Sequence, residues 1–151
     1  MTRDSPDIAY PDNATTIAER KKADQHQRAE LIRTTDNAVL ISIHQNSMPD
    51  HPSVHGAQVF YNGAASGPRL GETVQAALNG AVNAGNGKNA KAIDSTIYLM
   101  KNVQCPAILV ECGFLSNRTE TGQLLTGGYQ LKLAVCIAAG FLQHDTEGAS
   151  A

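Results

Sequence analysis

The fold is decided by one stretch of the sequence, Pro106-Ala-Ile-Leu-Val-Glu111-Cys-Gly113-Phe-Leu-Ser-Asn117. Residues 107–110 are apolar without interruption, and the run soon ends at a glycine, which is typical of a buried strand. A strand that is apolar on both faces belongs in a sheet covered by helices on both sides. The stretch therefore predicts an α/β protein with a carboxylate at the mouth of a buried strand.

Strands and helices alternate along the rest of the chain. The other expected strands are 38–44, 57–61 and 96–100. The expected helices are a mostly exposed one within 13–36, one from Pro68 to about 82, a short one from Asn117 to Gly127-Gly128, and a last one around 133–141. We predict a three-layer α/β domain with a mostly parallel sheet flanked by helices.

Composition excludes several classes of protein. With 151 residues, 42% of them hydrophobic and 17% charged, the chain fits one globular domain. A net charge of -2 gives no electrostatic reason to bind nucleic acid or an anionic membrane. No apolar run approaches the ~20 residues of a membrane span, and the first residues contain no secretory signal.

Glu111 is the first candidate for chemistry. A carboxylate on a central strand is costly if it is buried and unpaired, so it must meet a metal, a hydrogen-bond donor or a site water. Gly113, two positions later, allows the backbone to turn sharply there. From the residues alone, a catalytic Glu111 and a solvated glutamate at a strand end are equally good interpretations.

The second candidate lies in Ser42-Ile-His44-Gln-Asn46. Alternation along a strand sends Ser42, His44 and Asn46 to one face of the sheet. A histidine there can offer a neutral imidazole nitrogen to a metal, although a hydrogen-bonded structural histidine is the commoner case. We expect His44 and Glu111 to lie near each other and to face the same side, at equivalent strand ends.

Other candidates are weaker. His51 and His55 have the spacing of two ligands on one helix, but Pro49, Pro52 and Gly56 favour a solvated loop there. The three cysteines, Cys105, Cys112 and Cys136, show no CxxC spacing and are interpreted as small buried hydrophobes rather than a zinc or redox site.

These two segments resemble the zinc-dependent N-acetylmuramoyl-L-alanine amidases, which cleave the amide between N-acetylmuramic acid and L-alanine in peptidoglycan. The pattern 42–46 is similar to the family's third zinc ligand, and 106–117 is similar to its catalytic-glutamate motif. Similarity extends to 1–4, 17–28 and 56–61 and includes features of the spore-cortex and germination branch.

The resemblance implies roles for individual residues. His44 would be one of three protein ligands of Zn²⁺, and Glu111 would take a proton from the attacking water and pass it to the leaving amine. Asn46 and Lys91 are predicted to contact substrate. The partner implied is peptidoglycan, so the full-length protein would act in the cell wall, outside the cytoplasm. Similarity to the spore-cortex branch suggests a role in sporulation or germination, and both vegetative wall and spore cortex remain open as the substrate.

The chain also departs from the family pattern. The first two ligands of the family, a histidine in a Gly-His-Gly motif and a glutamate, are expected upstream of Met1, along with the family's first strands and helix. We therefore predict an amidase catalytic domain in its C-terminal portion at 1–143, a frayed tail at 144–151, and an inactive isolated chain. The sheet edge exposed in this way is expected to promote self-association.

Two other functions remain open. The chain could be a non-catalytic descendant that binds peptidoglycan, although such a module would need neither His44 nor Glu111. It could also be a zinc peptidase on a similar scaffold, which the sequence Gly113-Phe-Leu-Ser-Asn117 after the glutamate disfavours.

Overall fold

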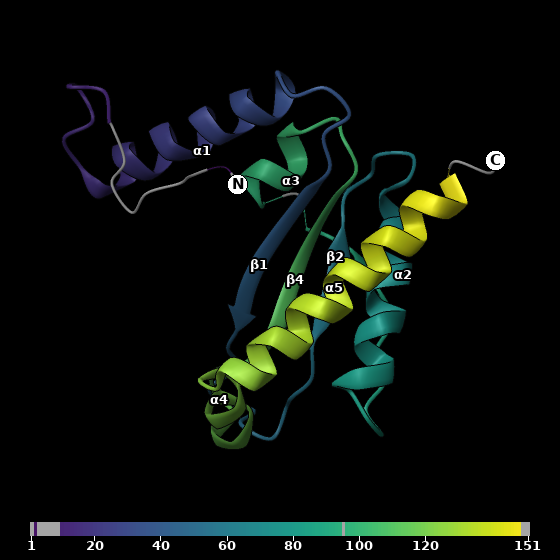
Figure 1. The fold of residues 1–151 in the computed structure, drawn as a ribbon. Coiled ribbons are helices and arrows are strands. Elements are labelled where there is room, and N and C mark those ends of the chain that lie inside the picture. Colours follow the sequence, from purple (N-terminus) through teal and green to yellow (C-terminus); the bar gives the residue numbers. More distant parts are fainter. Residues whose placement is uncertain (1, 3–9, 95, 149–151) are drawn as a thin grey trace.

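The computed structural model describes residues 2, 10–94 and 96–148. Most of the motif at residues 1–4 therefore lies outside the described residues. The elements, in chain order, are α1 (Ile17–Arg33), β1 (Leu40–Asn46), β2 (Gln58–Tyr61), α2 (Gly67–Ala81), β3 (Lys91–Ala92), α3 (Tyr98–Asn102), β4 (Ala107–Phe114), α4 (Arg118–Leu124) and α5 (Gly127–Gly148) (Figure 1).

One sheet of four strands, in the order β1-β4-β2-β3, forms the middle layer. β1 runs parallel to β4 and β2 runs parallel to β3, whereas β2 and β4 are antiparallel. Two of the three pairings are thus parallel, as predicted, and the sheet is mixed. The antiparallel pairing arises because the loop at 47–57 contains no crossover helix, so the chain reverses direction after β1.

Helices cover both faces of the sheet, which confirms the predicted three-layer α/β fold. Alternate residues of β4 face opposite layers: Ile108 and Val110 pack against α2 and α5, whereas Ala107 and Leu109 pack in the core beside α1 and α3. In Figure 1, α2 and α5 lie on one side of the strands, and α1 and α3 lie near their upper ends.

The prediction of a strand at 96–100 is wrong. The residues from Tyr98 form the short helix α3, and the fourth strand is instead the two-residue β3. Met100 explains the difference: it lies within α3 and is buried in the core with Leu109, as is Val103, the residue that follows the helix. Contacts with that core override the β propensity of residues 96–98.

The C-terminal helices also differ from the sequence-based prediction. α4 ends at Leu124 rather than at Gly127-Gly128, and these two glycines open α5. α5 continues to Gly148, past the predicted limit at 143, and Arg69 Nη2 donates a hydrogen bond to the His144 carbonyl there (2.9 Å). Residues 149–151 of the predicted tail lie outside the described part of the chain.

In the described part of the chain no single helix is long and apolar enough to cross a membrane. α4 and α5 reach the required length and hydropathy only when taken together, and a bend of 83° separates them.

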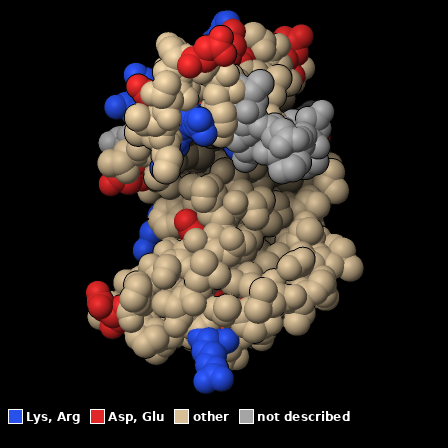
Figure 2. Space-filling view, turned by 90° about the vertical axis from the view of Figure 1, so that its left-hand side faces the viewer, with Lys and Arg blue, Asp and Glu red and all other residues tan. Residues whose placement is uncertain are grey.

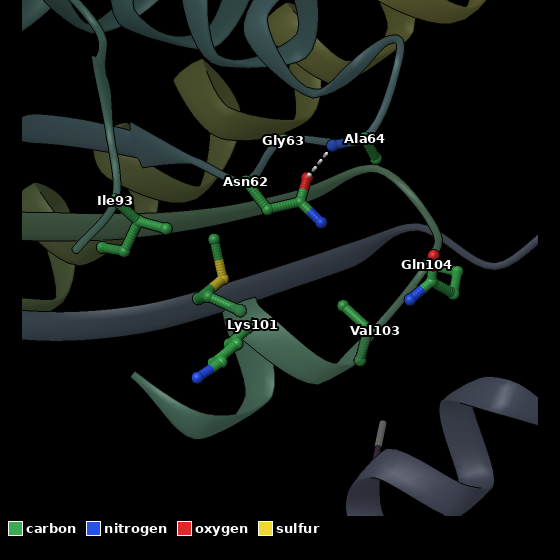
Figure 3. A pocket seen from close by; sticks show the side chains of 8 residues that line it. Asn62, Gly63, Ala64, Ile93, Lys101, Val103 and Gln104 are labelled. Carbon is green, nitrogen blue, oxygen red and sulfur yellow. Dashed lines mark hydrogen bonds between the residues drawn. The ribbon is translucent and has the colours of Figure 1, made fainter. Parts of the chain in front are cut away.

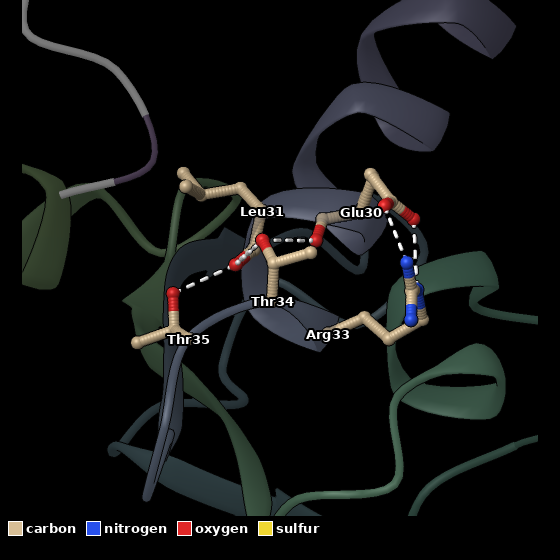
Figure 4. A network of polar contacts seen from close by, with 5 residues as sticks. All are labelled: Glu30, Leu31, Arg33, Thr34 and Thr35. Carbon is tan, nitrogen blue, oxygen red and sulfur yellow. Dashed lines mark hydrogen bonds and ion pairs between the residues drawn. The ribbon is translucent and has the colours of Figure 1, made fainter.

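The helix α1 is exposed along most of its length, as predicted, and only Ile32 is buried. A capping box starts it: Glu19 N–H donates to Thr16 Oγ1 (3.2 Å) and Thr16 N–H donates to Glu19 Oε2 (2.8 Å). Near its end, Arg33 pairs with Glu30 and the hydroxyls of the next two threonines donate to helix carbonyls (Figure 4). Local capping thus stabilises a helix that packs on little else.

β1 lies at one end of the strand order, so among the described residues no strand pairs with its outer edge. Ile43 on β1 is 53% exposed, and α5 also carries exposed apolar side chains, among them Leu131 and Val135, which are 65% and 58% exposed. Figure 2, which faces the β1 side, shows Lys, Arg, Asp and Glu mainly over the upper part and few of them in the middle. Self-association through this edge stays a prediction.

Candidate active site

The pairing of β1 with β4 brings the two candidate residues together. In this parallel ladder His44 is the register partner of Glu111, just as Leu40 is the partner of Ala107. Register partners in a sheet point to the same face, here the face that carries Leu40 and Leu109. The prediction that His44 and Glu111 lie close together on one face is confirmed.

Glu111 stands at the boundary between core and solvent. Val110 before it is fully buried, whereas Glu111 itself is half-buried and its Oε2 is buried without a hydrogen-bond partner among the described residues. Burial raises the pKa of Glu111 above its ordinary value, and the positive charge of a protonated His44 partly offsets this shift. A carboxylate with a free, desolvated oxygen is suited to accept a proton from a nearby water.

His44 is held in place by a neighbour on the same strand. Ser42, two residues earlier and on the same face, places its Oγ 2.9 Å from His44 Nε2. Such a hydrogen bond orients the ring and leaves Nδ1 as its second nitrogen. The predicted alignment of Ser42 with His44 is confirmed, and His44 is exposed to solvent at the strand end.

Asn46 ends β1 just beyond an irregularity in the register. The ladder shifts between His44 and Asn46, so that Asn46 pairs with Phe114. Its side-chain Oδ1 accepts from Ser47 N–H (2.7 Å), and its carbonyl accepts from Leu115 N–H (2.7 Å). Asn46 therefore lies at the rim of the site, and its contact with substrate stays a prediction.

Lys91 lies elsewhere in the sheet. It is exposed on β3 and pairs with Phe60 of β2, and β2 separates β3 from β4 in the strand order. The structure therefore does not bring Lys91 together with His44 and Glu111, which lie on β1 and β4.

His51 and His55 are exposed in a loop without helix, as the sequence predicted. Of the three cysteines, which were expected to be buried, Cys105 is only partly buried. Cys112 and Cys136 are buried in the core beside α2 and α5, and burial, with the charge of Glu111, raises the pKa of Cys112 to about 11. This fits small buried hydrophobes and an unreactive thiol.

The fit of a zinc ion to these residues is incomplete. A catalytic zinc site has three protein ligands and one open position. His44 and Glu111 offer one imidazole and one carboxylate, and the described residues contain no group of three His, Cys, Asp or Glu side chains that could hold a metal. These residues alone do not form the metal centre.

Sequence reasoning missed Glu120, an acidic residue of α4 that is only 5% exposed. Its carboxylate accepts hydrogen bonds from Gly56 N–H and Phe114 N–H, in the segments that follow β1 and end β4. The sequence signal was present, since Asn117 and Glu120 have the spacing of a helix cap, and Asn117 Oδ1 does accept from Glu120 N–H. That spacing accounts for the backbone of Glu120 but not for its buried carboxylate.

A cavity of about 290 Å³ lies at the other end of β4 (Figure 3). It is lined by Asn62, Lys101 and Gln104, among others. The Asn62 Oδ1 atom accepts from Ala107 N–H, at the residue where β4 begins, whereas Glu111 lies in the second half of the strand. The cavity is therefore separate from the candidate active site.

Glu111→Gln is expected to stabilise the protein at neutral pH. Burial disfavours the charged carboxylate, so the folded-state pKa of Glu111 lies above its ordinary value of 4.5. Glu111 is therefore tolerated best when it is protonated, at pH below 4.5, and destabilises the folded state as pH rises through its folded pKa. Glutamine is neutral at every pH and avoids this cost. The gain at pH 7 should be about 0.5 kcal/mol, allowing for solvent screening, and should vanish at pH 4. Urea unfolding at both pH values tests this, and an equal gain at pH 4 would contradict it.

Comparison with known proteins agrees with this geometry. The model of the N-acetylmuramoyl-L-alanine amidase family Amidase_3 matches residues 1–143. A germination-specific N-acetylmuramoyl-L-alanine amidase of Bacillus subtilis is 37% identical over 148 residues, which cover 97% of this chain and 61% of that relative. The chain therefore spans less than two thirds of that relative's length.

Solved structures give the same result. The CwlD amidase from Clostridioides difficile, solved in complex with the GerS lipoprotein, is 31% identical with a TM-score of 0.88, over 96% of this chain and 74% of that one. The amidase AmiC2 of Nostoc punctiforme is 29% identical with a TM-score of 0.70, over 80% and 65%. With a match over nearly its whole length and His44 beside Glu111, this chain belongs to the N-acetylmuramoyl-L-alanine amidase family.

Proposed function

We propose that this chain carries the catalytic base and one metal ligand of a zinc-dependent amidase that cleaves the bond between N-acetylmuramic acid and L-alanine in peptidoglycan. The observation that carries the proposal is the pairing of His44 with Glu111, whose Oε2 is buried and has no hydrogen-bond partner among the described residues. Zinc, when bound, would polarise the scissile carbonyl and lower the pKa of a bound water.

Glu111 acts as general base and then as general acid. Its raised pKa lets the carboxylate hold a proton taken from the attacking water, and the same oxygen can deliver that proton to the departing amine of L-alanine. His44, oriented by Ser42, contributes an imidazole nitrogen to the metal. Two further ligands must come from outside the described residues, because a site of this kind needs three.

Two features favour this function over the alternatives. A module that only binds peptidoglycan would have no use for a half-buried carboxylate with an unpartnered oxygen, because such a group costs stability. A zinc peptidase on a similar scaffold is disfavoured by the match of residues 1–143 to the amidase family. The similarity to a germination-specific relative supports spore peptidoglycan, outside the cytoplasm, as the substrate.

The experiment compares two proteins. The 151-residue chain alone is expected to hold no zinc tightly and to release no stem peptides from peptidoglycan, because His44 leaves two ligand positions unfilled. The same chain, extended by the upstream segment of a relative with the missing histidine and glutamate, should bind one zinc per molecule and cleave the amide. Zinc content and the appearance of new L-alanine amino termini are measured side by side.

A zinc-loaded and active 151-residue chain would overturn the assignment of ligands and would require His51 and His55 to be reconsidered. An extended protein that binds zinc but cuts only peptide bonds would instead favour the peptidase.

A further inference from the structure

Glu120 has no role in the proposed reaction, yet it is the acidic residue whose burial most needs an explanation. It is 5% exposed, and the ion pairs found within the described residues, Arg28–Asp24 and Arg33–Glu30, both lie in α1. A buried carboxylate without a basic partner is costly unless hydrogen bonds replace its hydration shell.

Two backbone N–H groups supply those hydrogen bonds. Gly56 N–H donates to Oε1 (2.8 Å) and Phe114 N–H donates to Oε2 (2.7 Å). Hydrogen bonds to a charged acceptor are shorter and stronger than neutral ones, and both distances are in that range. Gly56 lies at the end of the loop between β1 and β2, two residues before β2 begins, and Phe114 ends the strand of Glu111, so one carboxylate joins this loop to the end of β4.

A glycine allows the backbone to approach this carboxylate closely. A Cβ on Gly113 would lie 2.6 Å from the carboxyl carbon of Glu120, so a larger residue at this position would displace the carboxylate. Gly56, the other donor segment, has a φ of +96°, a backbone conformation that favours glycine. Gly113 therefore leaves the space that the Glu120 carboxylate fills.

Further hydrogen bonds join the same two segments at the rim of the site without touching Glu120. Leu115 N–H donates to the Asn46 carbonyl (2.7 Å), and Met48 N–H donates to Ser116 Oγ (2.9 Å). Both bonds require the loop after β1 to lie at a fixed distance from the end of β4. Among the described residues that bond these two segments together, Glu120 is the buried charged one.

We infer that Glu120 is a positioning residue for the active site: by bonding Gly56 and Phe114 it sets the separation of the segments that follow His44 and Glu111. The inference rests on the proposed function in one respect, that the end of the sheet with His44 and Glu111 is the active site. Its test does not measure turnover, so failure of either proposal can be recognised separately.

The test is native-state amide hydrogen exchange on the chain carrying Glu120→Gln. The amide of glutamine can accept from one of the two N–H donors but presents its own NH₂ to the other, which leaves that donor unpaired. We expect exchange to accelerate about tenfold or more at Gly56 or Phe114. We expect the same acceleration at Met48 and Leu115, which do not contact residue 120.

Ile137→Val is the matched control, because Ile137 lies on α5 and packs in the apolar core, and its side chain forms no hydrogen bond with Gly56 or Phe114. It should accelerate exchange evenly across the amides that open by global unfolding. If Glu120→Gln gives the same even pattern, or leaves Met48 and Leu115 unchanged, the inference is wrong. Glu120→Asp keeps the charge on a shorter side chain and should restore part of the protection; it also serves as the test if the glutamine variant fails to fold.

Discussion

Glu111→Gln is expected to lower the rate of amide cleavage by about a hundredfold or more in a form of the protein that carries all three zinc ligands. Glutamine has the shape of glutamate but cannot accept and return a proton at neutral pH. No side chain would then take the proton from the attacking water or deliver a proton to the leaving amine. The metal should remain, because His44, the proposed ligand opposite Glu111, is unchanged. Rate and zinc content are measured on the same sample.

The complementary variant separates the two roles. His44→Ala removes one of the three proposed ligands, so zinc content and activity should fall together. Glu72→Gln is the control, since Glu72 is an exposed glutamate on α2 and its charge should not matter. Loss of zinc from Glu111→Gln, or full activity in His44→Ala, would show that the roles of His44 and Glu111 are assigned wrongly.

Gly140→Ala is expected to destabilise the protein by about 3 kcal/mol, because α5 packs directly against the backbone of α2 at this position. A Cβ on Gly140 would lie 2.5 Å from Val74 Cα and 2.9 Å from the Thr73 carbonyl oxygen. These are backbone atoms of α2, so neither can turn away as a flexible side chain could, and the two helices must separate. Urea unfolding gives the change in the free energy of unfolding.

Gly80→Ala is the matched control on the partner helix. No heavy atom lies within 4 Å of a Cβ added there, and Gly80 lies inside α2. The alanine should stabilise the protein by about 0.5 kcal/mol, because glycine loses more backbone entropy in a helix. Equal effects at Gly140 and Gly80 would mean that α2 and α5 do not pack as closely as the structure shows.

The elements that the sequence predicted correctly are those with a strong local signal. β4 follows from four consecutive apolar residues, and β1 follows from a run of branched ones. α5 follows from the helical spacing of Leu133 and Ile137, both buried in the structure. The local signal was weak at residues 96–100, where a strand was expected, and the core contacts of Met100 produce a helix instead.

By itself, the sequence determined that Ser42 and His44 share one face of a strand, because side chains alternate with a period of two. It also determined that Glu111 follows a buried run. Only the tertiary structure decided that His44 lies opposite Glu111, that β2 runs antiparallel to β4, and that the carboxylate of Glu120 is buried between two backbone segments. These features depend on hydrogen bonds between residues distant in the sequence, and local propensity and periodicity carry no information about which distant segments will pair.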